Sequence, residues 1–263
     1  MGLPLEDAAK VLDCDRSKIS RIESGMRGIR PKELRELLTD YGVPDGEQAA
    51  LIGLASRYGQ RGWWEHYSDV VPEAFTDYLS MESAAAEIMI YQPQLVPDLL
   101  QTRDYALAIT AADPDCDTDG PREQAVAAKS ARQHAVILDG TPRVSVIIGE
   151  AAVRQQVGGP EVMAEQIGLL ARSAGTFPNV ILQVLPFSAG AHVASGTGAH
   201  AILRFPDAPS LGVVYVETVS GGTYLESQAD VARYTRAFEL LRAAALSPEA
   251  SRQVLENLSP PWF

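Results

Sequence analysis

Short polar and cationic side chains gather within two turns of one predicted helix, Arg16–Ser24. They lie on the face opposite Ile19 and Ile22, which are spaced to face a core. Arginine and lysine side chains can reach phosphates or guanine edges, and a serine hydroxyl can bond to either. The candidate DNA-contacting residues are Arg16, Ser17, Ser20 and Arg21, expected near bases, and Lys18, Arg27 and Arg30, expected nearer phosphates.

The charge of the chain is distributed unevenly. Its 263 residues carry a formal net charge of −12, and residues 61–263 account for −11 of it. Residues 14–32 instead hold six basic and only two acidic side chains. A protein that coats nucleic acid needs a broad basic surface, so that class is excluded, whereas a short cationic element on an acidic body can still contact DNA. The alternative interpretation of residues 14–32 is a solvated, charged helix face.

The candidate contacts lie within a run of short predicted helices. Apolar residues at helical spacing predict a helix over 4–12, and residues 13–15 predict a turn before the next helix. Gly25 is expected to end that second helix, and Pro31 is expected to open another. A helix, a three-residue turn and a second helix make the helix-turn-helix unit.

The predicted fold class is α+β, with a small all-α helix-turn-helix domain over 1–58 and a larger mixed α/β domain over 59–263. The larger domain is expected to hold a sheet of about four or five strands. Trp63 and Trp64 are too large to leave in solvent, so we expect them to dock the N-terminal helices onto this domain. The predicted helices cover 74–91, 97–112, 121–138, 161–174, 228–245 and 248–258, and the predicted strands cover 144–148, 180–185, 201–205 and 213–217.

A second candidate site is a ligand pocket in the larger domain. His192 and His200 flank a Gly-rich loop between two predicted strands, where pockets are often built. Glu217 ends a strand before a Gly turn, and Tyr224 follows that turn. These four residues are the candidate pocket residues. The alternatives are that the loop only turns the chain and that Glu217 pairs with an arginine.

The sequence predicts no catalytic residues, no metal and no cofactor. The four histidines lack ligand spacing, and Ser195 lies outside a nucleophile elbow. Residues 115–120 match the opening of an EF-hand loop, but Val126 stands where a bidentate Glu is required, so an acidic loop that caps the next helix is expected. Two distant cysteines indicate a reducing compartment, and the chain lacks an 18-residue apolar run, so we expect a cytoplasmic protein without a membrane span.

Several segments are similar to known families. The stretch RSKISRIESG, followed by RGIRPKELRELL, resembles the XRE (Cro/C1-type) helix-turn-helix family. The remainder resembles the domain that follows this unit in actinobacterial antitoxin-like transcriptional regulators, which are often encoded near a small partner protein. The segments that carry this second resemblance are GWWEHYSDVVPEAFTDYLSMESAA, IYQPQLVPDLLQTRDYA, ARQ at 131–133, IGEAAVRQQVGG, PNVILQVLPFSAGAH and VVYVETVSGGTYLES.

The resemblance implies a positioning helix at Leu5–Leu12 and a recognition helix at Arg16–Ser24. XRE units normally have a further helix before the positioning helix, so the sequence predicts a unit that lacks its first helix. The second family usually carries Gly where Asp98 stands, and Asp98 is predicted to be a helix N-cap.

The leading hypothesis is a transcriptional regulator that binds double-stranded DNA as a homodimer, because one such helix reads only a few base pairs. One alternative is a small-molecule-binding protein or an enzyme derived from such a regulator, which uses the pocket of the larger domain. The other is an antitoxin-type interaction module that binds a small partner protein through its acidic body.

Overall fold

The structure is a computed structural model and describes residues 4–57, 62–113, 116, 118–206, 211–218 and 221–258. The chain divides into two units, of which the first comprises residues 1–61 and 205–210 and the second comprises residues 62–204 and 211–263. Trp63 and Trp64 belong to the second unit, where Trp64 is buried and meets the Trp63 ring edge to face. Their predicted role in docking the N-terminal helices stays a prediction.

The first unit is a set of short helices around a small apolar core. Its helices are α1 (Leu5–Val11), α2 (Arg16–Glu23), α3 (Pro31–Asp40) and α4 (Asp45–Arg57). Asp13 has a left-handed backbone conformation, with φ of 45°, in the turn between α1 and α2. Gly25 has φ of 73° and ends α2, as predicted. Ala8 and Ala9 of α1 pack against Ile19 of α2, which holds the two helices of the predicted helix-turn-helix together.

The second unit is built on a mixed sheet of six strands. The strands are β1 (Glu87–Gln92), β2 (Arg143–Gly149), β3 (Val180–Leu185), β4 (His200–Arg204), β5 (Gly212–Thr218) and β6 (Gly221–Leu225). Their order is β3-β2-β1-β4-β5-β6. The strands β1, β2 and β3 are parallel, and the other neighbours are antiparallel. The predicted α+β class is confirmed, but the predicted sheet of about four or five strands omits β1 and β6.

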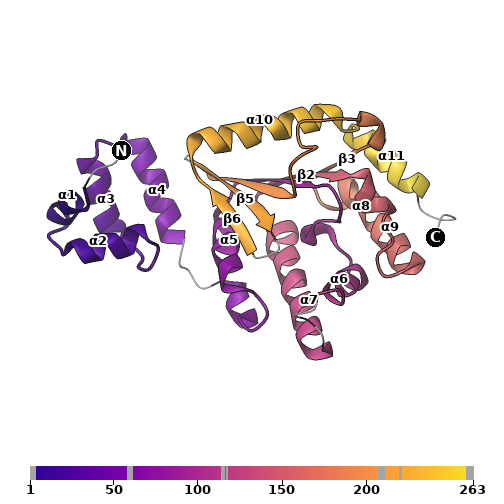
Figure 1. Ribbon diagram of the computed structural model, residues 1–263, viewed down its shortest axis with the longest axis horizontal. Coiled ribbons are helices and arrows are strands. Elements are labelled where there is room, and N and C mark those ends of the chain that lie inside the picture. The colour runs from indigo at the N-terminus through magenta and orange to yellow at the C-terminus, as the bar shows by residue number, and fades with distance from the viewer. Residues whose placement is uncertain are drawn as a thin grey trace. The chain divides into compact units, whose positions relative to one another are not determined.

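Helices cover both faces of the sheet, with α10 on one face and α5, α7 and α9 on the other (Figure 1). The helices are α5 (Glu73–Ala84), α6 (Arg103–Thr110), α7 (Asp119–Gln133), α8 (Glu150–Arg154), α9 (Pro160–Thr176), α10 (Gln228–Ala244) and α11 (Pro248–Leu258), and the shorter turns are η1 (Trp63–Tyr67), η2 (Asp98–Leu100), η4 (His134–Leu138) and η5 (Phe187–Ala189). Met89 and Tyr91 of β1 pack with Phe238 of α10. Within the described residues, no helix is long and apolar enough to cross a membrane.

The strand β1 corrects the prediction of a single helix over 74–91. The helix α5 ends at Ala84, and a strand begins at Glu87. Since β1 lies between β2 and β4 and is buried on both faces, its apolar residues follow one another without polar alternation. Such a run cannot be told from a buried helix by its periodicity. The strand β6 was not predicted, because it is short and opens with Gly221-Gly222, and glycine has a low β propensity.

The edge strand β3 is covered by the corner between α10 and α11. The backbone N–H of Val184 donates to Ser251 Oγ at 2.9 Å, and its carbonyl accepts from the Leu246 N–H at 2.9 Å. Gln183 Nε2 also donates to the Leu246 carbonyl, at 2.8 Å. These bonds occupy outward-facing backbone groups that an edge strand otherwise leaves open.

A single hydroxyl caps α6, and its removal gives the first prediction. Thr102 Oγ1 accepts a hydrogen bond from the Tyr105 N–H at 3.3 Å, and Thr102 is buried. We expect Thr102→Ala to lower the free energy of unfolding, measured in urea, by about 1 kcal/mol, because the N–H loses its acceptor. Thr118→Ala is the matched control, since Thr118 has the N-cap position of α7 but makes no side-chain capping bond within the described part of the chain. An equal loss in both variants contradicts the assignment.

Candidate DNA-binding helix and a buried charged cluster

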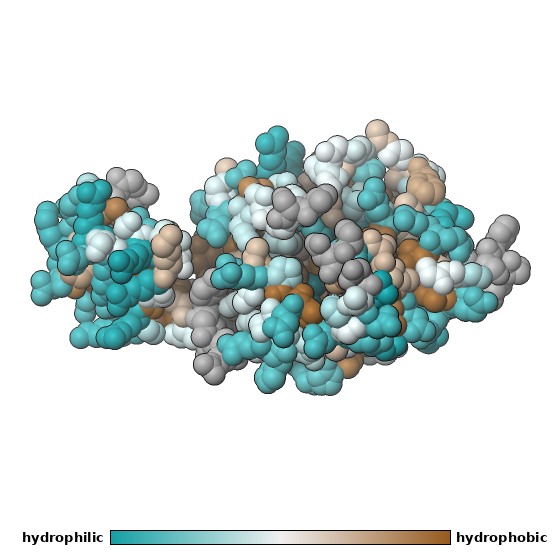
Figure 2. Space-filling view, turned by 60° about the horizontal axis from the view of Figure 1, so that its bottom comes forward, coloured by the Kyte–Doolittle hydropathy of each residue, from teal (hydrophilic) through white to brown (hydrophobic). Residues whose placement is uncertain are grey.

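The helix α2 presents a polar stripe to solvent. Ser17, Ser20 and Arg21 lie three and four residues apart on one face and are exposed, whereas Ile19 is buried and Ile22 is half-buried on the other. Hydrophilic side chains cover most of the visible face of the first unit (Figure 2). This stripe has the side chains that base and phosphate contacts require.

The ends of α2 are held by neighbouring segments. At its start, Arg16 Nη1 lies 3.1 Å from Glu6 Oε1 of α1, and both side chains are mostly exposed. At its end, the Arg27 N–H donates to the Arg21 carbonyl at 3.0 Å, which folds the following loop back against the helix. Arg27 and Arg30 are exposed in this loop. The structure therefore places four of the candidate arginines at the surface around one helix.

Lys18 differs from the other candidate residues. Its Nζ lies 2.7 Å from Glu33 Oε1 of α3, and the two side chains are only 18% and 22% exposed. A lysine held in this way cannot extend to a phosphate without breaking the pair. The phosphate contact of Lys18 stays a prediction, and in this structure its bond to Glu33 joins α2 to α3.

The Lys18–Glu33 pair gives the second prediction. The hydrogen bond from Lys18 lowers the pKa of Glu33 below its ordinary value of 4.5. A lowered pKa adds stability above the unfolded pKa, and that stability is lost as the pH falls through the folded pKa. We expect Glu33→Gln to weaken the hydrogen-exchange protection of α2 and α3 at pH 7 by about 0.5–1 kcal/mol, and the difference from the unmodified chain to vanish in acid.

Glu36→Gln is the control for that experiment. Glu36 Oε1 lies 4.0 Å from Lys32 Nζ, and the side chains are 45% and 88% exposed. Screening by water makes such a pair nearly neutral. Equal effects of Glu33→Gln and Glu36→Gln would show that the Lys18 bond does not position α2.

The second unit contains a buried arginine between two helices. Arg132 of α7 makes a bidentate pair with Glu82 of α5, with Nε–Oε2 at 2.8 Å and Nη2–Oε1 at 2.7 Å. The rings of Phe75 and Tyr78 lie 5.3 and 5.2 Å from the guanidinium carbon. Burial acts to lower the pKa of Arg132, but the Glu82 carboxylate outweighs it and raises this pKa above the ordinary value. The guanidinium therefore stays charged inside a cage of one carboxylate and two rings.

The same helix fixes the segment that follows β1. Asp98 Oδ1 lies 3.1 Å from Lys129 Nζ, and Asp98 Oδ2 lies 3.5 Å from Arg132 Nη1. Burial opposes the charge of Asp98, but Lys129 and then Arg132 hold its pKa below the ordinary value. Gln133 Nε2 donates to the carbonyls of Asp98 and Gln101, at 2.6 and 2.8 Å. Asp98 is thus an ion-pairing residue, which corrects the prediction of a helix N-cap, and Thr102 caps α6 instead.

Two family models match the chain. One, described as a helix-turn-helix domain, matches residues 1–51, and the other, described as a domain of unknown function (DUF5753), matches residues 75–257. The second match spans more than half of the chain. The chain belongs to the DUF5753 family. No curated protein and no solved structure matches it.

The DUF5753 domain separates the four residues that the sequence places in one pocket. His200 pairs with Tyr91 across β4 and β1, and both side chains lie on the α10 face. Glu217 and Tyr224 instead belong to the opposite face, where Tyr224 lies beside its strand partner Tyr215. The prediction of one pocket lined by His192, His200, Glu217 and Tyr224 is therefore wrong, because neighbouring strand positions point to opposite faces.

On the α10 face, His200 is a core residue. It is 4% exposed, and its ring lies 5.5 Å from that of Tyr91 and 5.0 Å from that of Tyr234. Burial lowers the pKa of His200 below its ordinary value of 6.5, because it disfavours the charged imidazolium. His192 accepts a hydrogen bond from the Ala194 N–H at its Nδ1, at 3.3 Å. Both histidines therefore shape the loop before β4 within the DUF5753 domain.

On the opposite face, tyrosines stack between α5 and the sheet. The Tyr215 ring lies 4.7 Å from that of Tyr78 and 5.2 Å from that of Tyr224. Tyr224 donates its hydroxyl to the Ala74 carbonyl at 2.9 Å. Burial, with a smaller effect of Tyr215, raises the pKa of Tyr224 to about 12. Gly222 makes this packing possible, since a Cβ there would lie 1.8 Å from the Tyr215 ring.

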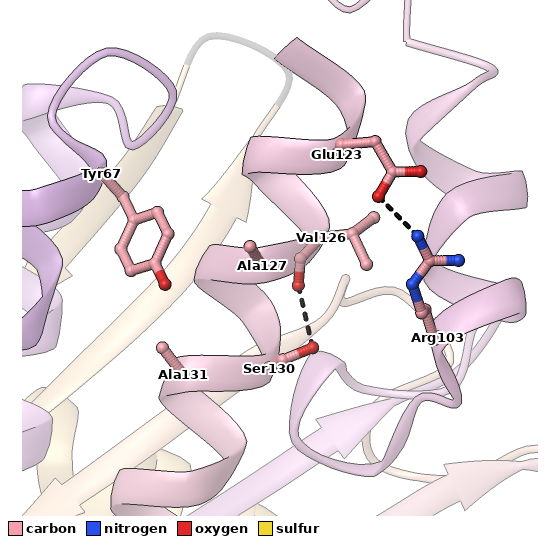
Figure 3. A pocket seen from close by; sticks show the side chains of 7 residues that line it. All are labelled: Tyr67, Arg103, Glu123, Val126, Ala127, Ser130 and Ala131. Carbon is pink, nitrogen blue, oxygen red and sulfur yellow. Dashed lines mark hydrogen bonds and ion pairs between the residues drawn. The ribbon is translucent and has the colours of Figure 1, made fainter. Parts of the chain in front are cut away.

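An open groove of about 450 Å³ runs along α7 (Figure 3). Arg103 of α6 crosses one side of it to Glu123, with Nη2–Oε2 at 2.5 Å, and the Tyr67 ring stands on the other side. The groove is lined by Tyr67, Arg103, Glu123, Val126, Ala127, Ser130 and Ala131. The small side chains of Ala127, Ser130 and Ala131 provide few groups that could bind a ligand specifically.

The sequence analysis did not predict the cluster that Arg132 forms with Glu82, Asp98 and Tyr78. The partners of Arg132 lie 34, 50 and 54 positions away in the chain, so no local pattern links them. The available signal was the resemblance, since Glu82 and Arg132 both fall within segments that carry it, whereas Asp98 stands where that family usually has Gly. Among the described residues, no group of three or more His, Cys, Asp or Glu could hold a metal ion. The EF-hand-like Asp115 and Asp117 lie outside the described residues.

Proposed function

We propose that the protein is a cytoplasmic, DNA-binding transcriptional regulator of the XRE (Cro/C1) type, with an antitoxin-like regulatory domain of the kind found in actinobacteria. In this proposal, residues 1–58 bind double-stranded DNA, and residues 59–263 sense a ligand or a small partner protein. The observation that carries it is the exposed stripe of Ser17, Ser20 and Arg21 on the second helix of a helix-turn-helix.

The proposed docking follows from the geometry of α2. The stripe enters the major groove, with Arg16, Ser17, Ser20 and Arg21 at base edges, while Arg27 and Arg30 contact phosphates. The body of the protein carries most of the negative charge, so attraction to DNA is confined to the face around α2. We further propose a homodimer, because two copies of a short recognition helix double the sequence that is read.

The proposal is tested by selecting ligands for the full chain from a random double-stranded DNA library. The expected result is an enriched inverted repeat, with half-sites separated by about one helical turn or a multiple of it. Binding of the enriched duplex should weaken steadily as salt rises, because phosphate contacts release counterions. Failure to enrich any sequence, together with binding that does not depend on salt, would overturn the proposal.

A further inference from the structure

A cavity of about 230 Å³ in the DUF5753 domain lies where α5, η1 and the segment between α7 and β2 meet. It is more enclosed than the groove along α7. Drug-sized ligands occupy pockets of about 300–1,000 Å³, so this cavity suits a smaller molecule. Its lining residues are Trp63 of η1, Leu79, Glu82 and Ser83 of α5, Ala135 and Val136 of η4, and Asp139, Gly140, Thr141 and Pro142, which precede β2.

One wall of this cavity is a π-helical turn, η4. The Asp139 N–H donates to the His134 carbonyl at 2.9 Å, five residues back, where an α-helix would bond four residues back. Such turns are rare and often occur at functional sites. The chain then folds tightly against the turn, since a Cβ at Gly140 would lie 2.0 Å from the Val136 carbonyl oxygen. The π-turn and the residues that follow it therefore line the same cavity.

This wall is held in place by Asn179, which directly precedes β3. Asn179 Nδ2 donates to the carbonyls of Val136 and Pro142, at 3.3 and 3.2 Å. One amide thus joins the π-turn to the segment before β2. A cavity whose walls are already fixed binds a ligand at a lower cost in conformational entropy.

Two carboxylates line the cavity. Glu82 is buried in its wall, and Arg132, which does not line the cavity, bonds both of its oxygens and balances its charge. The Asp139 side chain is 70% exposed, and its Oδ2 lies 3.0 Å from His134 Nε2, which orients the carboxylate. Among the described residues that line the cavity there is no Lys, Arg or His. The cavity therefore presents a carboxylate, and no cation, on the side that solvent reaches.

The hydroxyl of Ser83 adds a further acceptor to the lining. It donates its only proton to the Ser80 carbonyl at 2.7 Å, so it can only accept a hydrogen bond from a ligand. Ionised carboxylates likewise only accept, whereas the Thr141 hydroxyl can donate or accept. A matching ligand must therefore supply donors, and an ammonium group supplies three together with a positive charge.

The remaining walls are apolar and include one indole ring. The ring of Trp63 makes T-shaped contacts with those of Trp64 and Tyr67, with centroids 5.8 and 6.1 Å apart. Among aromatic rings, an indole attracts cations most strongly. The aliphatic side chains of the lining are those of Leu79, Ala135, Val136 and Pro142. An ammonium group attached to an apolar chain therefore matches both kinds of wall.

We propose that this cavity binds an alkylammonium group together with its adjoining apolar chain. The ammonium group pairs with Asp139 and meets the Trp63 ring, and the apolar chain packs on the π-turn. The source is either a small organic amine or a lysine side chain of a partner protein. The proposal rests on the sensing role proposed for residues 59–263, and it is tested without DNA.

The experiment measures binding to the full chain by calorimetry at fixed ionic strength. One probe is phenethylamine, and its controls are the neutral 2-phenylethanol and the anionic phenylacetate. The other probe is a five-residue peptide with a central lysine and blocked ends, and its control carries acetyl-lysine in place of lysine. We expect at least one ammonium probe to bind, and its uncharged control to bind about tenfold more weakly or not at all.

Two variants with matched controls tie the binding to the cavity. Ala135→Leu fills the space beside the π-turn and is expected to weaken the active probe at least about tenfold. Ala127→Leu is its control, because Ala127 is exposed on α7 and lines the other groove. Asp139→Asn is expected to weaken binding about three- to fivefold, since the carboxylate is exposed. Asp104→Asn removes the same charge from α6, outside the cavity, and should leave binding unchanged.

The outcomes distinguish the two sources. Binding of phenethylamine alone supports a small-molecule ligand, binding of the peptide alone supports a lysine of a partner protein, and binding of both supports the shared chemistry. The proposal is overturned if neither probe binds, if 2-phenylethanol or phenylacetate binds as well as the amine, or if each variant binds as its control does. Arg21→Ala should bind the probes normally, so a failure at this cavity leaves the DNA-binding proposal standing.

Discussion

Replacing Arg132 with methionine is expected to lower the free energy of unfolding of the larger unit by about 3–5 kcal/mol. The change leaves the Glu82 carboxylate, which is 2% exposed, without the two hydrogen bonds that it now accepts. A buried charge without a partner is among the most costly defects in a folded protein. The rings of Phe75 and Tyr78 also lose the cation that lies over them. Thermal and urea unfolding of the full chain measure the loss.

A double variant separates the charge from the packing. Glu82→Met combined with Arg132→Met removes both partners and fills their space with flexible apolar side chains, so we expect it to recover much of the stability that Arg132→Met alone loses. If the losses of the two single variants simply add in the double variant, the pair is not coupled and our account of the cluster is wrong.

Arg21→Ala is expected to weaken binding of the selected DNA duplex by about 1–3 kcal/mol, which is about 5–150-fold. Arg21 is exposed on the same face of α2 as Ser17 and Ser20, so its side chain is free to meet a base edge in the major groove. Titration at one fixed salt concentration measures the effect, because affinity for DNA depends steeply on salt.

Two further variants identify the kind of contact that Arg21 makes. Arg21→Lys keeps the charge but loses the bidentate fork, so it should bind almost as poorly as Arg21→Ala if Arg21 reads a guanine. Arg233→Ala, in α10 of the larger unit, is exposed and removes the same charge without touching α2. An Arg21→Ala variant that binds as well as Arg233→Ala would remove Arg21 from the interface.

The sequence predicts local elements well where one helix face is apolar and stop signals are strong. The bounds of α2 follow from Ile19 on one face and from Gly25, whose positive φ only a glycine adopts easily. The sequence does not predict β1, because burial on both faces removes the alternation of polar and apolar residues. It does not predict β6, because that short strand opens with two glycines. In both cases the sheet supplies the stability that the local sequence does not indicate.

The sequence predicts the two candidate sites to different degrees, because the residues of one lie close together in the chain and those of the other do not. The residues of α2 are close in the chain, so their types and spacing suffice to group them. Arg132, Glu82 and Asp98 come together only through the packing of α7 against α5 and η2. For the same reason the histidines of the Gly-rich loop and Glu217 looked like one site in the chain but fall on two faces of the sheet.

The covered edge at β3 limits how copies of this protein can associate. A strand from another molecule that tried to continue the sheet beyond β3 would find the backbone groups of Val184 already bonded to Ser251 and Leu246. An added strand could therefore not pair with the backbone of Val184, which interrupts the edge of the sheet at that residue. The proposed homodimer is therefore expected to form through side chains rather than by pairing of two β3 strands at Val184.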